Sequence, residues 1–565
     1  MSVNKDRERA AADISTEAEL LILIRELLGN QAVSADDDFF ALGGHSLLAG
    51  RLAVRIKNQF GVNLALPQIH AGRTAARMAA MIEAGGDTGG PPEPPPLRPA
   101  EPGRRIPLTF PQERIWLLEQ MSPGSIAYQA QLVLHLHGPL DIDVLTRVLN
   151  ELVQRHDVFR TRFTDVDGVP LQQTVPAIQI DVPVLELPGP ARADQERAAA
   201  EIIETEVRHN FDIENPPLVR WTVLRYGPQE HVLLHVEHHM VHDGWSFAVL
   251  YAELAELYEA RLAGRPSPLP ELGLGFGDLA AWQHDWLTGP TLARFVNHWT
   301  ARLAGAPTLD LPTDRPRPEE FSFRGAVHRF QMPEREYRAL RACASENGVT
   351  LFSLMFTGFA ALMSLYAGQH DFMLGVGVAN RRTAEAERLV GMVVNTLPLR
   401  VDLAGDPALA DLLHQVHETA LDAYAWQDVP LQRLVKALAP ARDLSRNPLF
   451  STMFSFHDSA VPDLQFDGVR GEVSYLHNGS AKSEFNVVVI PRAEQRVGRT
   501  GHDQDLSMKV IWEYATDLFD RVTVEALAGM YRQLLTEWLA DPGLPLSRLP
   551  VALAAGRLGR GRVRS

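Results

Sequence analysis

The stretch His238-His239-Met240-Val241-His242-Asp243-Gly244-Trp245-Ser246 follows a run of residues with strand character. Alternate residues of a strand point to opposite faces. This alternation places His238 with the apolar residues of one face, so it predicts a structural core histidine. His239 falls on the other, more polar face, which also carries His235 and Glu237, and there it can meet a substrate.

A helical pattern begins directly after this stretch. Leu250, Leu254, Tyr258 and Leu262 recur at intervals of four residues, which is typical of the buried side of a helix. Ser246 is suited to cap this helix. The histidine motif therefore lies in a strand-to-helix loop, where functional side chains are common.

The residue types of this loop suggest proton transfer. A neutral imidazole near pH 7 can accept a proton from an attacking amine or orient that amine, so His239 is the candidate. Asp243, in a tight turn with Gly244, could act directly or hold the shape of the loop. His238, His239, His242 and Asp243 are also possible metal ligands. Because neighbouring histidines of a strand point apart, they cannot readily share one ion, and we predict no metal site.

A second motif, Leu42-Gly43-Gly44-His45-Ser46-Leu47, lies far upstream. Its glycines allow a tight turn, and the N-terminus of the helix that follows favours negative charge through its free N–H groups. A phosphodiester on the Ser46 hydroxyl would be well placed there. The alternative is that Ser46 is only the N-cap of the helix.

Length and composition limit the possible classes of protein. A chain of 565 residues is too long for one core, and the net charge of −16 argues against a nucleic-acid-binding protein. Cys343 is the single cysteine, so no intrachain disulfide can form. The first residues are charged and no apolar run is long enough to span a membrane. We expect a cytoplasmic protein that binds neither nucleic acid nor a membrane.

The patterning predicts several units along the chain. Residues 1–84 read as a small helical bundle, with helices at about 16–28, from 46 onward and at about 74–83. Residues 85–105 form a Gly/Pro-rich linker, flexible in its first half and a semi-rigid polyproline spacer in its second, which would let the bundle move. Strands and helices then alternate in two lobes, 106–275 and 276–550. Residues 551–565, rich in arginine, are predicted to be a disordered tail.

The serine motif and its surroundings resemble a known family. The segment Asp38-Phe39-Phe40-Ala41-Leu42-Gly43-Gly44-His45-Ser46-Leu47, within a small helical bundle, is similar to the peptidyl carrier proteins of nonribosomal peptide synthetases. The resemblance implies that Ser46 carries 4′-phosphopantetheine, attached by a separate phosphopantetheinyl transferase. The thiol of this cofactor would hold an acyl or peptidyl group as a thioester.

The histidine motif resembles the His-His-x-x-x-Asp-Gly signature of condensation domains, whose two lobes are related to chloramphenicol acetyltransferase. Further segments match other motifs of that family in the same order: Gln112–Leu117, Arg155–Phe163, Phe276–Trp282, Val390–Thr396 and Arg442–Phe450. Three departures concern the shape of the tunnel. Trp426 stands where the family usually has His, Leu431-Gln432 where it has Phe-Glu, and Pro111 where it has Ala.

The resemblance implies roles for the residues of the motif. His239 would be the central catalytic residue, as general base or positioning group. Asp243 would be structural and pair with an arginine from a distant segment, for which we choose Arg381. Gly244 would keep the approach to the thioester clear, with His238, Trp245 and Ser246 supporting the site.

The expected function is therefore peptide-bond formation between a donor on Ser46 and an amine on a downstream acceptor carrier, with upstream and downstream adenylation domains as further partners. His45 and the Arg155–Phe163 pattern look more like a domain that takes an L-configured donor. The rivals are an epimerase of the same fold, a heterocyclisation domain, a free-standing acyltransferase and a non-catalytic platform that recruits a tailoring enzyme.

Overall fold

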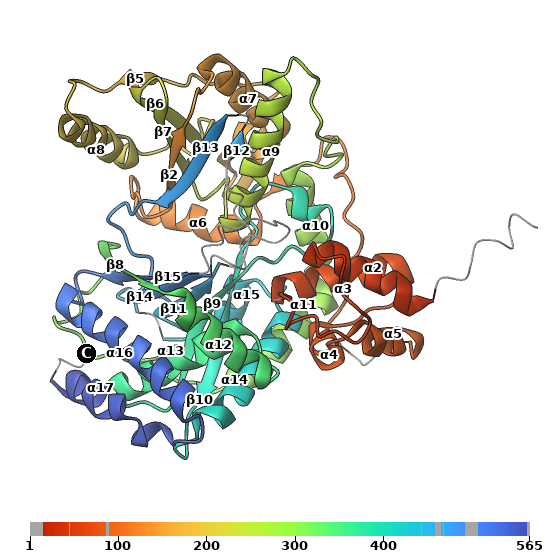
Figure 1. Ribbon diagram of the computed structural model, residues 1–565, viewed down its shortest axis with the longest axis vertical. Coiled ribbons are helices and arrows are strands. Elements are labelled where there is room, and N and C mark those ends of the chain that lie inside the picture. Colours follow the sequence, from red (N-terminus) through yellow and green to blue (C-terminus); the bar gives the residue numbers. More distant parts are fainter. Residues whose placement is uncertain are drawn as a thin grey trace, which may run out of the picture.

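The computed structural model describes residues 15–44, 46–85, 90–441, 443–457, 465–466, 468–491 and 507–561. Within these residues the apolar side chains form three separate cores. One belongs to the N-terminal helical bundle and one to each of two larger lobes, which lie above one another in Figure 1 with the bundle at their side. The structure therefore confirms the predicted fold class, a small helical bundle followed by two α/β lobes.

The N-terminal bundle contains α2 (Thr16–Leu28), α3 (Ser46–Phe60), α4 (Leu66–Gly72) and α5 (Ala75–Glu83). The cap of the first helix is Ser15, whose Oγ accepts a hydrogen bond from the backbone N–H of Ala18. Gly29 ends that helix with φ 59°, in the left-handed region that glycine adopts without strain. The short α4 was absent from the sequence prediction because its 7 residues span only about two turns.

The linker does not behave as the free spacer that its composition suggested. From residue 90 onward it lies along helix α10 (Phe276–Trp286). Trp282 Nε1 donates to the carbonyl of Pro95 at 2.9 Å, and the N–H of Ala100 donates to Asp278 Oδ1 at 2.8 Å. Leu97 is buried in the core of the first lobe. The flexibility expected of the Gly-rich half falls on residues 86–89, which lie outside the described residues.

The first lobe is built on a six-stranded sheet of order β12-β13-β2-β7-β6-β5. Its strands are β2 (Gln129–His137), β5 (Val184–Glu186), β6 (Val219–Gly227), β7 (Glu230–His238), β12 (Gln465–Phe466) and β13 (Val469–Tyr475). A small sheet joins β1 (Ile106–Pro107), β4 (Val169–Thr174) and β3 (Thr161–Val166). The helices of this part are α6 (Phe110–Met121), α7 (Ile142–Arg155), α8 (Arg192–Arg208), α9 (Gly244–Leu262) and the 3-10 turn η1 (Asp157–Arg160).

The division into lobes 106–275 and 276–550 is wrong in one respect. Strand β13 comes late in the chain but pairs antiparallel with β2, and Figure 1 shows its blue arrow among the orange and yellow strands of the first lobe. Phe276 and Leu279 of α10 also lie in the core of the first lobe. The second part of the chain therefore returns to complete the first lobe.

The second lobe contains a six-stranded sheet of order β10-β9-β11-β14-β15-β8. Its strands are β8 (Gly325–Met332), β9 (Asp371–Val378), β10 (Asn395–Asp402), β11 (Thr452–Phe456), β14 (Phe485–Pro491) and β15 (Met508–Ala515). Its helices are α11 (Gly289–Leu303), α12 (Glu334–Glu346), α13 (Leu351–Ala367), α14 (Leu409–Ala425), α15 (Leu431–Leu438), α16 (Arg521–Ala540) and α17 (Pro550–Arg560), with 3-10 turns η2 (Ala386–Arg388) and η4 (Leu546–Arg548).

The predicted disordered tail, residues 551–565, is wrong over most of its length. Helix α17 packs against α13, and Val551 and Ala555 are fully buried. Gly559 permits this approach, because a Cβ at that position would lie 1.9 Å from the carbonyl oxygen of Tyr366. Residues 562–565 lie outside the described part of the chain. The arginine-rich composition concealed a short amphipathic helix.

In the described part of the chain, no single helix combines the length and apolarity that a membrane span requires. The bent pair of α12 and α13 passes by length and composition only.

The strand-to-helix junction at the histidine motif differs from the prediction in two details. Both faces of β7 are buried, so the face with His235 and Glu237 is covered rather than open. Helix α9 begins at Gly244, and its N-cap is Asp243, whose side chain accepts from the N–H of Ser246. Ser246 is therefore not the cap but the third residue of the helix.

Candidate active site

His239 is the first residue after β7 and lies beside a cavity of about 600 Å³ between the two lobes. Its backbone N–H donates to the carbonyl of Tyr128 at 2.8 Å, which fixes the main chain. Burial, followed by the charge of Lys482, holds the pKa of His239 well below its ordinary value. The imidazole is therefore uncharged at neutral pH.

The cavity is lined by both lobes and by the N-terminal bundle. The first lobe contributes Tyr128, His239 and Gly244, and the second lobe contributes Asn395 and Asn486 among others. The bundle contributes the middle of α3, from Gly50 to Lys57, and the linker contributes residues 91–94. A reacting group in this cavity would meet residues from every part of the chain.

His238 lies in the core, as expected of a structural histidine. It is fully buried, its Nε2 lies 3.2 Å from Glu119 Oε1, and its Nδ1 accepts from the N–H of Met240 at 3.2 Å. Both ring nitrogens are thus occupied inside the protein.

A buried carboxylate behind the loop was missed by the reading of the sequence. Glu237 Oε1 lies 2.8 Å from His242 Nδ1, and Glu237 Oε2 lies 3.3 Å from His235 Nε2. Burial raises the pKa of Glu237, but the two imidazoles outweigh burial and lower it. The alternation of acid and histidine along this strand was the available signal, but it was interpreted as a polar, open face.

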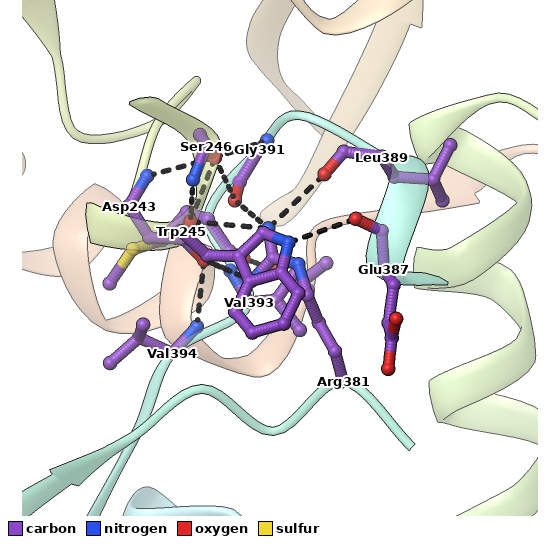
Figure 2. A network of polar contacts seen from close by, with 11 residues as sticks. Asp243, Trp245, Ser246, Arg381, Glu387, Leu389, Gly391, Val393 and Val394 are labelled. Atoms are coloured by element: carbon purple, nitrogen blue, oxygen red, sulfur yellow. Dashed lines mark hydrogen bonds and ion pairs between the residues drawn. The ribbon is translucent and has the colours of Figure 1, made fainter. Parts of the chain in front are cut away.

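Asp243 holds the loop by contacts to several segments (Figure 2). Arg381 donates from Nη1 to Asp243 Oδ2 at 2.7 Å and from Nη2 to Oδ1 at 3.1 Å. The backbone N–H groups of Val393 and Val394 donate to the same Oδ2, and Ser246 Oγ donates to Oδ1. Burial raises the pKa of Asp243, but the charge and hydrogen bonds of Arg381, together with His242 and Ser246, outweigh burial and lower that pKa. The carboxylate is therefore charged, and each of its oxygens accepts hydrogen bonds.

The same network ties the start of α9 to the loop after β9. Ser246 Oγ accepts from the N–H of Gly391 at 3.0 Å, and Arg381 Nη2 donates to the carbonyl oxygens of Leu389 and Gly391. Trp245 Nε1 donates to the carbonyl of Glu387 at 2.8 Å. Asp243, Trp245, Ser246 and Arg381 thus form one polar network between the start of α9 and the loop after β9, which we call the bracket (Figure 2).

Gly244 faces open space. A Cβ built at this position would meet no atom within 4 Å, although the residue lines the cavity. Crowding by neighbouring protein atoms is therefore not the reason for a glycine at this position. A side chain would instead occupy space that belongs to the cavity.

The serine motif forms the start of α3. Gly43 has φ +116°, and a Cβ on Gly44 would lie 2.4 Å from the ring of Phe39, so the turn before the helix requires both glycines. The backbone of Ser46 begins α3, whereas its side chain and His45 lie outside what the structure describes. No acidic residue stands in the first turn of α3. A helix start without an acidic residue in its first turn fits the phosphate of 4′-phosphopantetheine, because the first N–H groups of a helix have no partner within the helix.

The bundle is docked on the two lobes through α3 and α4. Arg51 lies 3.3 Å from Glu387 and its guanidinium carbon is 4.6 Å from the centre of the Trp245 ring. On the other side, the rings of His70 and His417 are 5.2 Å apart. The bundle thus contacts the bracket directly, through Trp245.

Within the described ranges, no group of three or more His, Cys, Asp or Glu side chains is arranged to hold a metal ion.

The last of the five segments that resemble condensation-domain motifs, Arg442–Phe450, is described from Asp443 onward. Its first residue, Arg442, lies outside the described residues.

Comparisons with known proteins agree with this architecture. Residues 103–556 match the family described as "Condensation domain", and residues 18–82 match the family described as "Phosphopantetheine attachment site". Tyrocidine synthase 3 of Brevibacillus parabrevis is 35% identical over 546 residues, which cover 96% of this chain and 8% of that protein. Phosphinothricin tripeptide synthetase PhsB of Streptomyces viridochromogenes is 34% identical over 539 residues, which cover 94% of this chain and 44% of that protein.

Solved structures share the fold. The X-domain in its complex with OxyB from teicoplanin biosynthesis superimposes with a TM-score of 0.71 and 25% identity, over 82% of this chain and 99% of that one. The first condensation domain of the CDA synthetase superimposes with a TM-score of 0.67 and 23% identity, over 79% of this chain and 99% of that one. The chain thus spans less than half the length of the curated relatives named above, but nearly all of these solved domains.

The two matched families cover the bundle and both lobes in the predicted order. Members of the phosphopantetheine-attachment family carry 4′-phosphopantetheine on a serine, and condensation domains of peptide synthetases catalyse amide-bond formation. This chain belongs to the condensation-domain family of nonribosomal peptide synthetases, with a peptidyl carrier domain preceding its condensation domain.

Proposed function

We propose that the chain joins an acyl or peptidyl donor, held as a thioester on Ser46, to the amine of an aminoacyl group on a downstream carrier. The observation that carries this proposal is the uncharged His239 at the wall of a cavity shared by the two lobes and the carrier domain. Upstream and downstream adenylation domains would supply donor and acceptor. The resemblance of His45 and the Arg155–Phe163 segment favours an L-configured donor.

Ser46 is the proposed attachment site. The two-glycine turn presents the start of α3, where backbone N–H groups are free to face a phosphate. When attached by a phosphopantetheinyl transferase, the group supplies a thiol that carries the donor as a thioester. Tethering both substrates raises their effective concentration, which is a large part of the expected catalysis.

His239 is proposed to act on the acceptor amine. Its lowered pKa keeps the ring neutral, so it can accept a hydrogen bond from the amine, but also makes it a weak base. These properties favour orientation of the amine over full proton abstraction. Gly244 leaves the adjoining space free for the substrate.

Asp243 and Arg381 are proposed to be structural. Their atoms are committed to each other and to the backbone of the loop after β9, which leaves Asp243 no free oxygen for chemistry. His238, Trp245 and Ser246 support the same loop. Their shared role would be to keep His239 at a fixed depth in the cavity.

The test is intact-protein mass spectrometry. The chain is incubated with a phosphopantetheinyl transferase and a peptidyl-coenzyme A, followed by aminoacyl-loaded acceptor carriers with apolar, polar and charged side chains. Loading that Ser46→Ala abolishes, followed by transfer that His239→Ala abolishes, is the expected result. Absence of loading at Ser46 would overturn the carrier assignment. Loading with α-proton exchange and no transfer would identify an epimerase instead.

A second candidate is a non-catalytic platform. It is supported by the similarity to the X-domain that was solved in complex with OxyB. A platform would bind its partner equally well after His239→Ala, whereas a condensation domain would lose transfer.

A further inference from the structure

Lys482 lies directly beside His239, although the two residues are far apart in the chain. Its Nζ is 2.6 Å from His239 Nε2. Lys482 belongs to the segment that leaves β13 in the first lobe and enters β14 in the second. Both residues line the cavity between the lobes. The contact therefore links His239 of the first lobe to the loop that precedes β14 of the second lobe.

The position of Lys482 is fixed by its neighbours in the chain. The N–H of Ala481 donates to the carbonyl of Phe323 at 2.8 Å, and the N–H of Glu484 donates to the carbonyl of Ser451 at 2.8 Å. The N–H of Lys482 itself reaches Glu513 Oε1 at 3.5 Å. The backbone is thus anchored on both sides of Lys482, and the side chain lies at the cavity wall beside His239.

The charged and titratable groups around the pair come from several elements. Arg114 of α6 and Glu513 of β15 act on Lys482, while His238 and His242 act on His239. The ring of Tyr128 lies 5.4 Å from Lys482 Nζ. Burial first, and then Arg114, lowers the pKa of Lys482 to about 8, although Glu513 opposes this. The charge of Lys482 is in turn the second cause that lowers the pKa of His239.

We propose that Lys482 is a positioning residue for His239, which it holds through a hydrogen bond from Nζ to Nε2. With Nε2 accepting this bond, the proton of the neutral imidazole resides on Nδ1. The lysine thus sets the orientation and the tautomer of the ring before the acceptor arrives. Nε2 is then the single acceptor of the neutral ring, and the acceptor amine would take the place of Nζ as its donor. The inference rests on the proposed function only where it assigns a consequence for amide formation.

Lysine and arginine both donate from a cation, whereas methionine has similar length and no donor. Lys482→Met therefore removes the bond and the charge, and Lys482→Arg retains both. Lys436→Met is a matched control, because Lys436 is exposed on α15, at a distance from the histidine motif in the sequence. Thermal unfolding of each variant checks that the fold is retained.

The first readout is independent of any substrate. The protein is labelled with ¹³Cε1-histidine, and the His239 signal is assigned as the one lost in His239→Asn. In Lys482→Met, we expect the titration midpoint of His239 to rise by at least one pH unit, because the neighbouring positive charge is removed. One pH unit corresponds to a tenfold change in proton affinity. Lys482→Arg and Lys436→Met should leave it low. An unchanged midpoint in Lys482→Met would overturn the proposal, whatever the function of the chain.

The second readout is single-turnover transfer from the loaded carrier to an aminoacyl-loaded acceptor carrier. Lys482→Met should lower the maximal rate about 10- to 100-fold while the half-saturating acceptor concentration stays within twofold, since loss of one positioning contact misplaces the ring. Lys482→Arg should recover part of the rate. If Lys482→Met shifts the titration but not the rate, His239 does not depend on its lysine partner and the positioning role is overturned. If wild-type protein fails to transfer while the titration shifts, the proposed function fails and the contact stands.

Discussion

Arg381 and Asp243 form an ion pair that joins the loop after β9 to the start of α9, with two hydrogen bonds of 2.7 and 3.1 Å. Their side chains are only 1% and 2% exposed. The pair belongs to segments separated by 138 positions in the sequence. It connects the second lobe to the aspartate of the histidine motif, four residues after His239, so we expect the pair to help hold His239 in place.

Breaking this pair should be costly. Arg381→Ala leaves an unpaired buried carboxylate, for which we expect a loss of about 3–5 kcal/mol in the free energy of unfolding. Transfer activity should fall with it, although His239 itself is unchanged. Arg208→Ala, which removes a surface ion pair to Glu204 with side chains 70% and 63% exposed, should cost about 1 kcal/mol or less. Equal losses for the two variants in urea unfolding would contradict the structural role.

The contact of Arg51 with Glu387 and Trp245 should stabilise the docked position of the carrier domain. An ion pair of this exposure and a cation–π contact together contribute about 1 kcal/mol, or roughly a fivefold change in the docked population. Arg51→Ala should therefore widen the distribution of distances between fluorophores placed on α5 and α16. Arg77→Ala, an exposed arginine of α5, should not change it. A distribution unaltered by Arg51→Ala would show that other contacts hold the carrier.

Docking should also weaken in acid. Burial, together with the charges of nearby groups, lowers the pKa of His70 to about 3 and that of His417 to about 4. Both histidines have a lower pKa in the docked state than in the undocked state, where it is about 6.5. Docking is therefore strongest above pH 6.5, and it weakens progressively as the pH falls toward 4, because the undocked state takes up protons more readily.

Small-angle scattering at pH 7.5 and pH 5.5 can detect this change. The wild-type chain should become more extended at the lower pH. His70→Leu should remove much of the pH dependence, whereas His209→Leu, at an exposed position after α8, should leave it intact. A pH response identical in wild type and His70→Leu would exclude this interface as its source.

The C-terminal helix should be sensitive to one added methyl group. A Cβ at Gly559 would lie 1.9 Å from the carbonyl oxygen of Tyr366, so Gly559→Ala must push α17 away from α13. Overpacking of this kind costs about 1–3 kcal/mol. Gly561→Ala meets only the backbone of its own helix, at 3.6 Å, and should be tolerated. Equal melting temperatures for the two variants would argue against the packing of α17.

Much of the architecture could be predicted from local patterns. The i+4 spacing along α3 and α9, the glycine turn before Ser46 and the alternation along β7 depend on neighbouring residues, so they can be read from a linear sequence. The pairing of Asp243 with Arg381 could be named in advance only through the family resemblance. The short α4 and the arginine-rich α17 escaped because both are brief and compositionally atypical.

The amino-acid order alone thus established the serine motif of the carrier, the histidine motif of the condensation domain, and their order in the chain. It also placed His239 between a strand and a helix, because backbone preferences and side-chain periodicity act over a few residues. It could not reveal the return of β13 to the first lobe, the burial of Glu237 between two histidines or the contact of Lys482 with His239. Those depend on which distant segments pack together. Burial, which shifts the pKa values of His239 and Lys482, is a property of that packing and not of any single stretch of sequence.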